Sequence, residues 1–147
     1  MTKRRQRRRG RQETQAPLAQ TNRASGNDTY RLRRKVINLV YSARDLARSC
    51  GVELPRVTVR VTTRDEGERN LLGAARLAND IIWITEDAIQ LPAEDLRAVV
   101  YHEIVHAVCG IRHVEGCPLM GSTLVEGQSN RVLDKLFMGY IKRALDE

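Results

Sequence analysis

The sequence predicts an α+β domain in which helices pack against a small sheet. Two observations predict this class. Apolar residues recur at helical spacing in three separate stretches, and β-branched residues alternate or cluster as in strands between positions 56 and 85. The length of 147 residues suits one such domain. We therefore expect a tail over residues 1–27 and a folded domain over residues 28–147.

The first 27 residues predict a disordered basic tail, because they are polar and nearly free of large apolar groups. Residues 1–11 carry seven positive charges and no acidic residue, whereas the rest of the chain holds 18 basic and 18 acidic residues. Such a run favours contact with nucleic-acid phosphates, although a localisation signal or a solvated tail has the same composition. The basic residues of the run are Lys3, Arg4, Arg5, Arg7, Arg8, Arg9 and Arg11.

The folded domain is expected to begin with a helix followed by a small sheet. Asp28 is the expected N-cap of this helix, and Gly51 is its expected C-terminal cap. Residues 56–63 alternate valine with polar residues and predict a strand with one buried face. Residues 71–78 predict a weaker strand and residues 81–85 a strong one, and these two are expected to form a hairpin.

Two further helices are expected in the second half of the chain. Pro92 suits the first turn of a helix that ends at Gly110. This helix is expected to bury one apolar face made by Leu96, Val100, Ile104, Ala107 and Val108. Residues 123–147 predict a final helix with apolar positions at Val132, Leu133, Leu136, Phe137, Tyr140, Ile141 and Ala144.

All three histidines of the chain fall within residues 102–113, HEIVHAVCGIRH. His102 and His106 lie four residues apart on the predicted helix, about 40° apart around its axis, so both imidazoles can reach one ion. Glu103 projects about 100° from His102, where a carboxylate can contact a metal-bound water. His113 supplies a third nitrogen, and catalytic zinc usually takes three protein ligands and one water. The cluster predicts one Zn²⁺ ion, with Glu103 as the general base.

Other interpretations of these residues stay open. A closed structural zinc site would use the three histidines together with Cys109 or Cys117. The histidines could instead be ordinary surface or core residues. Cys109 could be an inhibitory thiol or a small buried side chain, and a disulfide between the two cysteines is a further alternative. Glu103 favours catalysis, because a carboxylate beside the metal has no obvious structural purpose.

The stretch HEIVHAVCGIRHVEGCPLM resembles the metzincin zinc peptidases, whose signature is H-E-x-x-H-x-x-G-x-x-H followed by a methionine-containing turn. Here the glycine and the third histidine each arrive one residue late. The resemblance covers about residues 93–122 by motif. It implies a compact zincin-like fold in which Met120 forms the Met-turn beneath the metal. It also implies that an edge strand within residues 71–85 holds an extended peptide substrate by strand addition.

Two narrower similarities concern the same stretch. The cysteine before Met120 is similar to the archaemetzincin branch, although this chain lacks the further cysteines with which that branch binds a second zinc ion. The late third histidine and the basic tail are similar to compact metallopeptidases that digest DNA-crosslinked proteins.

Together these features predict a small zinc-dependent endopeptidase that hydrolyses peptide bonds by a metal-activated water. Two alternatives are a nucleic-acid-associated structural protein, of virion or chromatin type, with a non-catalytic zinc site, and a zinc hydrolase acting on another amide. The expected partners are a peptide or protein substrate and, through the tail, nucleic acid. Neither a secretory signal nor a transmembrane segment is apparent, so we expect a cytoplasmic or virion-associated protein without membrane contact. The low, odd number of cysteines favours a reducing compartment.

Overall fold

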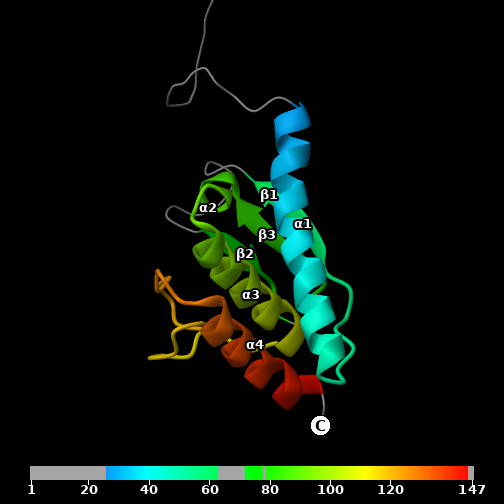
Figure 1. Cartoon of the computed structure of the whole chain (residues 1–147), viewed down its shortest axis with the longest axis vertical. Coiled ribbons are helices and arrows are strands. Elements are labelled where there is room, and N and C mark those ends of the chain that lie inside the picture. Colours follow the sequence, from blue (N-terminus) through cyan, green and yellow to red (C-terminus); the bar gives the residue numbers. More distant parts are fainter. Residues whose placement is uncertain (1–25, 63–71, 78, 146–147) are drawn as a thin grey trace, which may run out of the picture. The chain divides into compact units, whose positions relative to one another are not determined.

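The computed structural model describes residues 26–62, 72–77 and 79–145. The chain divides into two units, Met1–Arg31 and Leu32–Glu147, and the described part of the first unit is the start of one helix. The elements are α1 (Gly26–Ser49), β1 (Thr58–Thr62), β2 (Gly73–Ala75), β3 (Ile81–Thr85), α2 (Glu86–Ile89), α3 (Ala93–Cys109) and α4 (Asn130–Leu145) (Figure 1). This content of helices and strands confirms the predicted α+β class.

The three strands form one mixed sheet in the order β1-β3-β2. β1 runs parallel to β3, with Val59 opposite Ile82, and β2 runs antiparallel to β3, with Ala74 opposite Trp83. The antiparallel pair confirms the predicted hairpin. Side chains alternate along a strand, so the buried Val59, Ile82 and Ile84 share the face that packs on α3.

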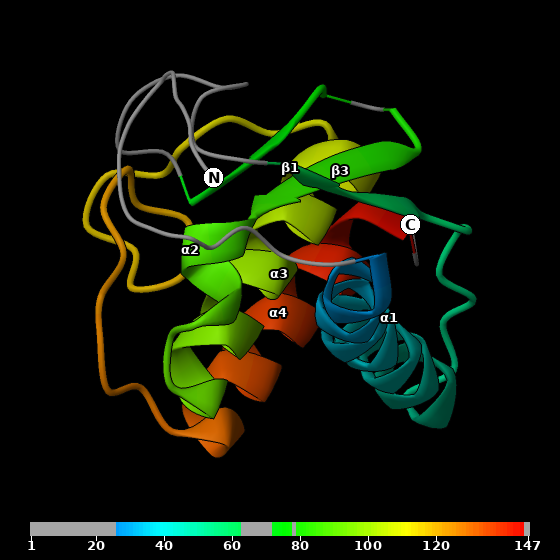
Figure 2. The ribbon, with the colours of Figure 1, turned by 90° about the horizontal axis from the view of Figure 1, so that it is seen from above.

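The helix that carries two of the histidines, α3, packs against both the sheet and α4 (Figure 2). Residues on most of its sides are buried, including Val99 and Val105 outside the predicted apolar face. The predicted apolar face is buried as expected at Leu96, Val100, Ile104 and Ala107. It is not the only buried side of α3, because a helix covered on several sides is apolar nearly all round. Of that predicted face, Val108 is only half-buried.

The ends of α3 are set by a proline and a glycine. Pro92 is the N-cap and stands just before the first turn, not within it as predicted, and its carbonyl accepts a hydrogen bond from Leu96 N at 2.9 Å. Gly110 adopts the left-handed conformation with φ of 69°, which glycine accepts at little cost. The turn at Gly110 redirects the chain toward His113.

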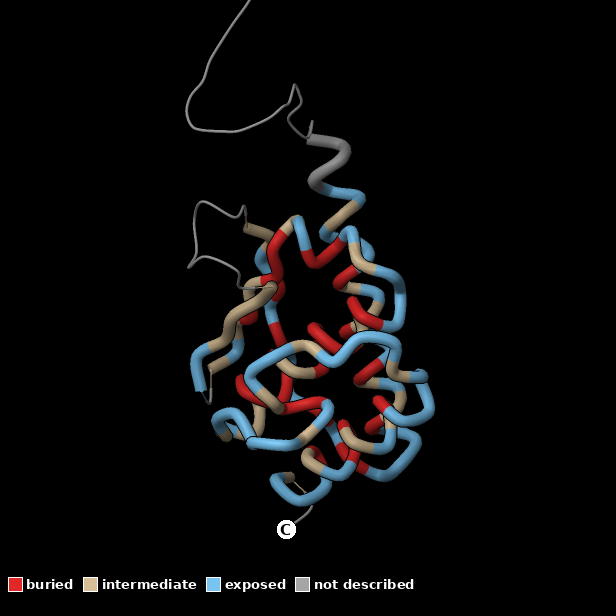
Figure 3. Tube along the Cα trace, turned by 90° about the vertical axis from the view of Figure 1, so that its left-hand side faces the viewer, coloured by how far each residue is buried: buried red, intermediate tan, exposed pale blue. Residues whose placement is uncertain are grey.

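Within the second unit, α1 packs through small and branched side chains at helical spacing. Val36, Val40, Ala43 and Ala47 are all buried, and Figure 3 shows the buried residues gathered inside the trace. The helix begins at Gly26, so Asp28 lies within it and is not its N-cap. Glycine and asparagine, which precede Asp28, are also common at helix starts. The predicted glycine cap is confirmed, since Gly51 has φ of 84°.

The last helix, α4, begins at Asn130 and not at residue 123 as predicted. Gly127 has φ of 78°, which a continuous helix does not allow, and Ser129 Oγ accepts a hydrogen bond from Val132 N at 3.2 Å as a helix cap. Val132 and Ala144, two of the apolar positions of the predicted helix, are exposed. Phe137 is buried and stacks on Tyr101 of α3 with ring centroids 4.2 Å apart.

None of the helices described here combines the length and the apolar composition needed to cross a membrane.

Candidate metal centre

Two of the three histidines are brought together by the geometry of α3. His102 and His106 are one helical turn apart, and His102 Nε2 lies 3.0 Å from His106 Nε2. The chain leaves α3 at Gly110 and returns His113 to the same place, with its ring centroid 5.1 Å from that of His102 and 5.0 Å from that of His106. One nitrogen from each of the three residues lies within 4.8 Å of the others. The three residues could therefore hold one metal ion.

The other ring nitrogen of each helical histidine contacts a backbone carbonyl of the segment after α3. His102 Nδ1 lies 2.8 Å from the carbonyl oxygen of Leu119, and His106 Nδ1 lies 2.6 Å from that of Ile111. A carbonyl oxygen can only accept, so each Nδ1 must donate. In a neutral imidazole the proton is then on Nδ1, and Nε2 is left with a free lone pair.

These tautomers leave two hydrogen-bond acceptors facing each other at 3.0 Å. Two lone pairs at this distance repel unless a cation or a proton lies between them. Nitrogens bound to one tetrahedral zinc ion at about 2.0–2.1 Å would stand about 3.4 Å apart, close to the observed separation. The donor set, three imidazoles oriented by backbone carbonyls, thus fits zinc.

Burial keeps the two helical imidazoles neutral. The pKa of His102 is lowered to about 4 chiefly by burial, although its hydrogen bond to Leu119 acts in the opposite direction. Burial also lowers the pKa of His106. Protons therefore compete weakly for these nitrogens at neutral pH, which favours metal binding. His113 is exposed and lines a cavity of about 580 Å³, so the centre opens toward solvent on that side.

Glu103 points from α3 toward the edge strand β2. Its carboxyl group has no hydrogen bond or ion pair within the described part of the chain, and only 5% of the residue is exposed. Burial raises its pKa to about 8. A Cβ atom at Gly73 of β2 would lie 3.0 Å from both Cγ and Oε2 of Glu103, so only glycine lets the strand approach this closely. The carboxyl group is thus confined beside the backbone of β2.

Met120 lies in the segment that returns from His113 to the core. It is fully buried, and its neighbour Leu119 supplies the carbonyl that orients His102. Met120 O accepts from Val114 N at 2.8 Å, and Cys117 O accepts from Gly121 N at 3.0 Å, so the segment is folded on itself. These bonds fix the carbonyl of Leu119 relative to α3.

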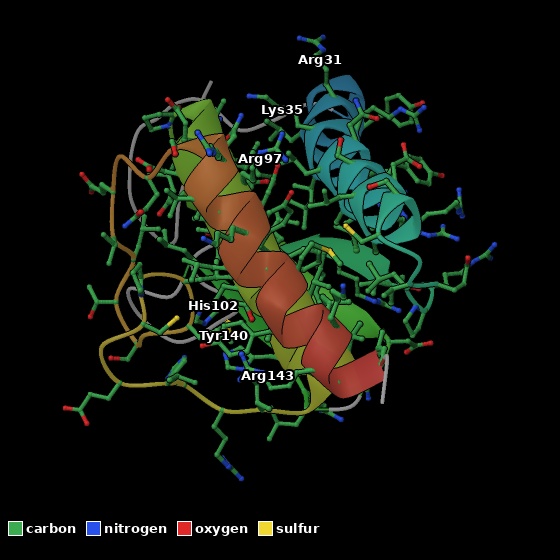
Figure 4. All side chains as sticks on the ribbon, turned by 60° about the horizontal axis from the view of Figure 1, so that its bottom comes forward. Arg31, Lys35, Arg97, His102, Tyr140 and Arg143 are labelled. Carbon is green, nitrogen blue, oxygen red and sulfur yellow. The ribbon has the colours of Figure 1, made fainter. Side chains whose placement is uncertain are left out.

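Both cysteines near the histidines are free thiols directed at α4. Cys109 Sγ contacts the carbonyl of Tyr140 at 3.7 Å, and burial raises its pKa to about 11. Cys117 Sγ accepts hydrogen bonds from Tyr140 OH at 3.1 Å and from Met120 N at 3.3 Å. In the described residues, the group that could hold a metal contains the three histidines and neither cysteine. Figure 4 shows Tyr140 and His102 among the side chains of this region.

Several contributors to the centre were not predicted. The carbonyls of Ile111 and Leu119 carry no sequence signal, because every residue has one. Gly73 and Tyr140 act by contacts between elements far apart in the chain. The predicted nucleic-acid-binding residues of the tail, from Lys3 to Arg11, lie outside the described residues.

No protein-family model, curated protein or solved structure matches this chain.

Proposed function

We propose that the protein is a zinc-dependent endopeptidase of metzincin type. The observation that supports this most directly is the pair of Nε2 lone pairs that converge at 3.0 Å. The same helix carries the buried carboxyl group of Glu103, which has no partner among the described residues. A zinc site that only stabilised the fold would need the three histidines and a fourth ligand, and it would not need Glu103. The motif order H-E-x-x-H, late histidine and buried methionine agrees with the metzincin resemblance.

In this proposal His102, His106 and His113 hold the zinc ion. When bound, zinc supplies a Lewis acid that polarises a carbonyl and activates water at neutral pH. Glu103 accepts a proton at its carboxylate and later donates it to the leaving amine. In the metal-free protein, burial raises the pKa of Glu103, which brings its proton exchange closer to neutral pH.

The surroundings of Glu103 can hold a peptide. β2 is an edge strand of the described sheet and lies against this carboxyl group. An extended peptide that pairs with an edge strand would place its backbone beside Glu103. The cavity next to His113, lined also by Pro118 and Val125, leaves room for a side chain of that peptide.

The decisive test compares hydrolysis and zinc content in one pair of variants. Zinc-loaded wild-type protein should cleave an unstructured protein such as casein, and Glu103→Gln should lose this activity by about 100-fold or more while keeping one zinc ion. Glu126→Gln, an exposed carboxyl in the loop before α4, is the matched control and should keep both.

Two other results would contradict this proposal. Bound zinc without any hydrolysis of proteins or peptides would refute the peptidase. Hydrolysis of small amides alone would instead indicate a different zinc hydrolase.

A further inference from the structure

The sheet has an outward face that differs from the face against α3. Ile82 and Ile84 are fully buried, whereas Trp83 between them is only half-buried. Trp83 pairs with Arg60 of β1, so these two side chains lie side by side on the outward face. The next position on the other side of Trp83 is Ala74 of β2, which leaves the indole uncrowded there.

A groove of about 470 Å³ runs along β1 on this part of the molecule. It is lined by Arg33 of α1, the five residues of β1 and Trp83. We call it the β1 groove. It combines two guanidinium groups with the only tryptophan of the chain. Because β1 and β2 are opposite edges of the sheet, the β1 groove is separate from the edge that approaches Glu103.

Basic residues predominate in the segment that supplies α1 and β1 to the β1 groove. Residues 32–62 contain seven basic and two acidic residues. Both acidic residues, Asp45 and Glu53, pair with Arg48 near the end of α1. Arg33 and Arg60 have no ion-pair partner in the part of the chain that is described. These two guanidinium groups are thus available to an anion.

A hydrogen bond between α1 and β1 disfavours the binding of a peptide along this edge of the sheet. In a parallel pair the N–H and C=O of alternate residues point away from the partner strand, and Val59 is such a residue of β1. Its carbonyl is already used, since Arg33 Nε donates to Val59 O at 3.4 Å. A strand added to β1 would have to displace this hydrogen bond.

We propose that the β1 groove binds single-stranded nucleic acid. A base stacks on Trp83, and phosphates on either side of that base pair with Arg33 and Arg60. Aromatic stacking does not require a particular base, so the binding is expected to show little sequence preference. This inference goes beyond the proposed peptidase activity and does not depend on it.

Because Trp83 is the only tryptophan, its fluorescence reports on the groove even in the full chain with its basic tail. Titration with a short oligothymidylate should quench this fluorescence. Between about 50 and 200 mM salt, Arg60→Ala should reduce the slope of log K against log salt by about 0.7, the value for one phosphate contact on a single strand. Arg131→Ala, an exposed arginine on α4, is the control and should leave the slope unchanged.

A second pair of variants tests the stacking. With a labelled oligothymidylate followed by anisotropy, Trp83→Ala should weaken binding by about tenfold, and Trp83→Phe should retain most of it. Thermal unfolding of each variant shows whether the fold is kept, and Arg60→Ala, which changes an exposed residue, tests the proposal if Trp83→Ala unfolds. Absent quenching, or equal slopes for Arg60→Ala and Arg131→Ala, would overturn the proposal. Equal quenching by a polyglutamate peptide would overturn it as well, because charge alone would then explain the binding.

Discussion

Replacing Gly73 with alanine tests how the structure holds Glu103. The added methyl group would lie 3.0 Å from Glu103 Cγ, Glu103 Oε2 and the carbonyl oxygen of Trp83. Carbon contacts are optimal at about 3.5–4.0 Å, so either the carboxyl group or strand β2 must move. The Glu103 side chain can rotate away, but the carbonyl of Trp83 belongs to the backbone of β3.

We expect Gly73→Ala to lower the free energy of unfolding by about 1–3 kcal/mol, as for other overpacked sites. For a domain of this size the melting temperature should fall by roughly 5–10 °C. Displacement of the carboxyl group should reduce the proposed hydrolysis by about 10–100-fold. The zinc affinity should stay unchanged, because the three heavy atoms nearest the added methyl group belong to Glu103 and Trp83 and not to a histidine.

Gly139→Ala on α4 is the matched control. Its Cβ atom would meet only Arg143 Nη2, at 4.0 Å, and alanine in an exposed helix should stabilise by about 1 kcal/mol. A double-mutant cycle separates the two contacts of Gly73, since Glu103→Ala removes the carboxyl group but keeps the carbonyl of Trp83. If Gly73→Ala costs as much in the Glu103→Ala background as in the wild type, Gly73 does not confine Glu103 and the reasoning is wrong.

Three further predictions concern pH, metal and the core. Burial raises the pKa of Glu103 from 4.5 to about 8, so the stability from its protonated form is complete below about pH 4.5 and is lost as the pH rises to about 8. In urea unfolding of the metal-free protein, the free energy of unfolding of the wild type should therefore fall by roughly 3–5 kcal/mol relative to that of Glu103→Gln over that pH range. If the two proteins show the same pH dependence of this free energy, the carboxyl group of Glu103 is not buried without a partner. Zinc at a hundred times its Kd should raise the free energy of unfolding by about 2.7 kcal/mol, and His113→Ala should abolish most of this gain at the same zinc concentration. Tyr101→Phe should cost about 1 kcal/mol by removing the 2.6 Å hydrogen bond from Tyr101 OH to Asp134, whereas Tyr41→Phe, at 51% exposed, should cost almost nothing in the same melts.

Local patterns in the sequence predicted local structure well. The spacing of His102 and His106 placed both on one side of a helix, because residues four apart are neighbours in any α-helix. The glycine caps after α1 and α3 were also predicted from local sequence, because the left-handed conformation depends on a single residue and glycine adopts it readily. The hairpin of β2 and β3 joins segments that are adjacent in the chain.

Long-range contacts could not be predicted in this way. The parallel pairing of β1 with β3 crosses a long connection and has no turn signal of its own. The apolar pattern of α3 was interpreted as one face because the sequence does not show how many elements surround a helix. The contact between Gly73 and Glu103 depends on how closely β2 approaches α3, which no spacing of residues reveals.

One short connection, residues 110–121, carries His113 together with the carbonyls of Ile111 and Leu119. Helix α3 sets the positions of His102 and His106, while the orientation of their rings and the position of His113 depend on these twelve residues. Changes at the exposed residues of this connection could retune metal selectivity or affinity, whereas Leu119 and Met120 also belong to the core. The same short stretch thus combines residues that set the metal site with two residues that pack in the core.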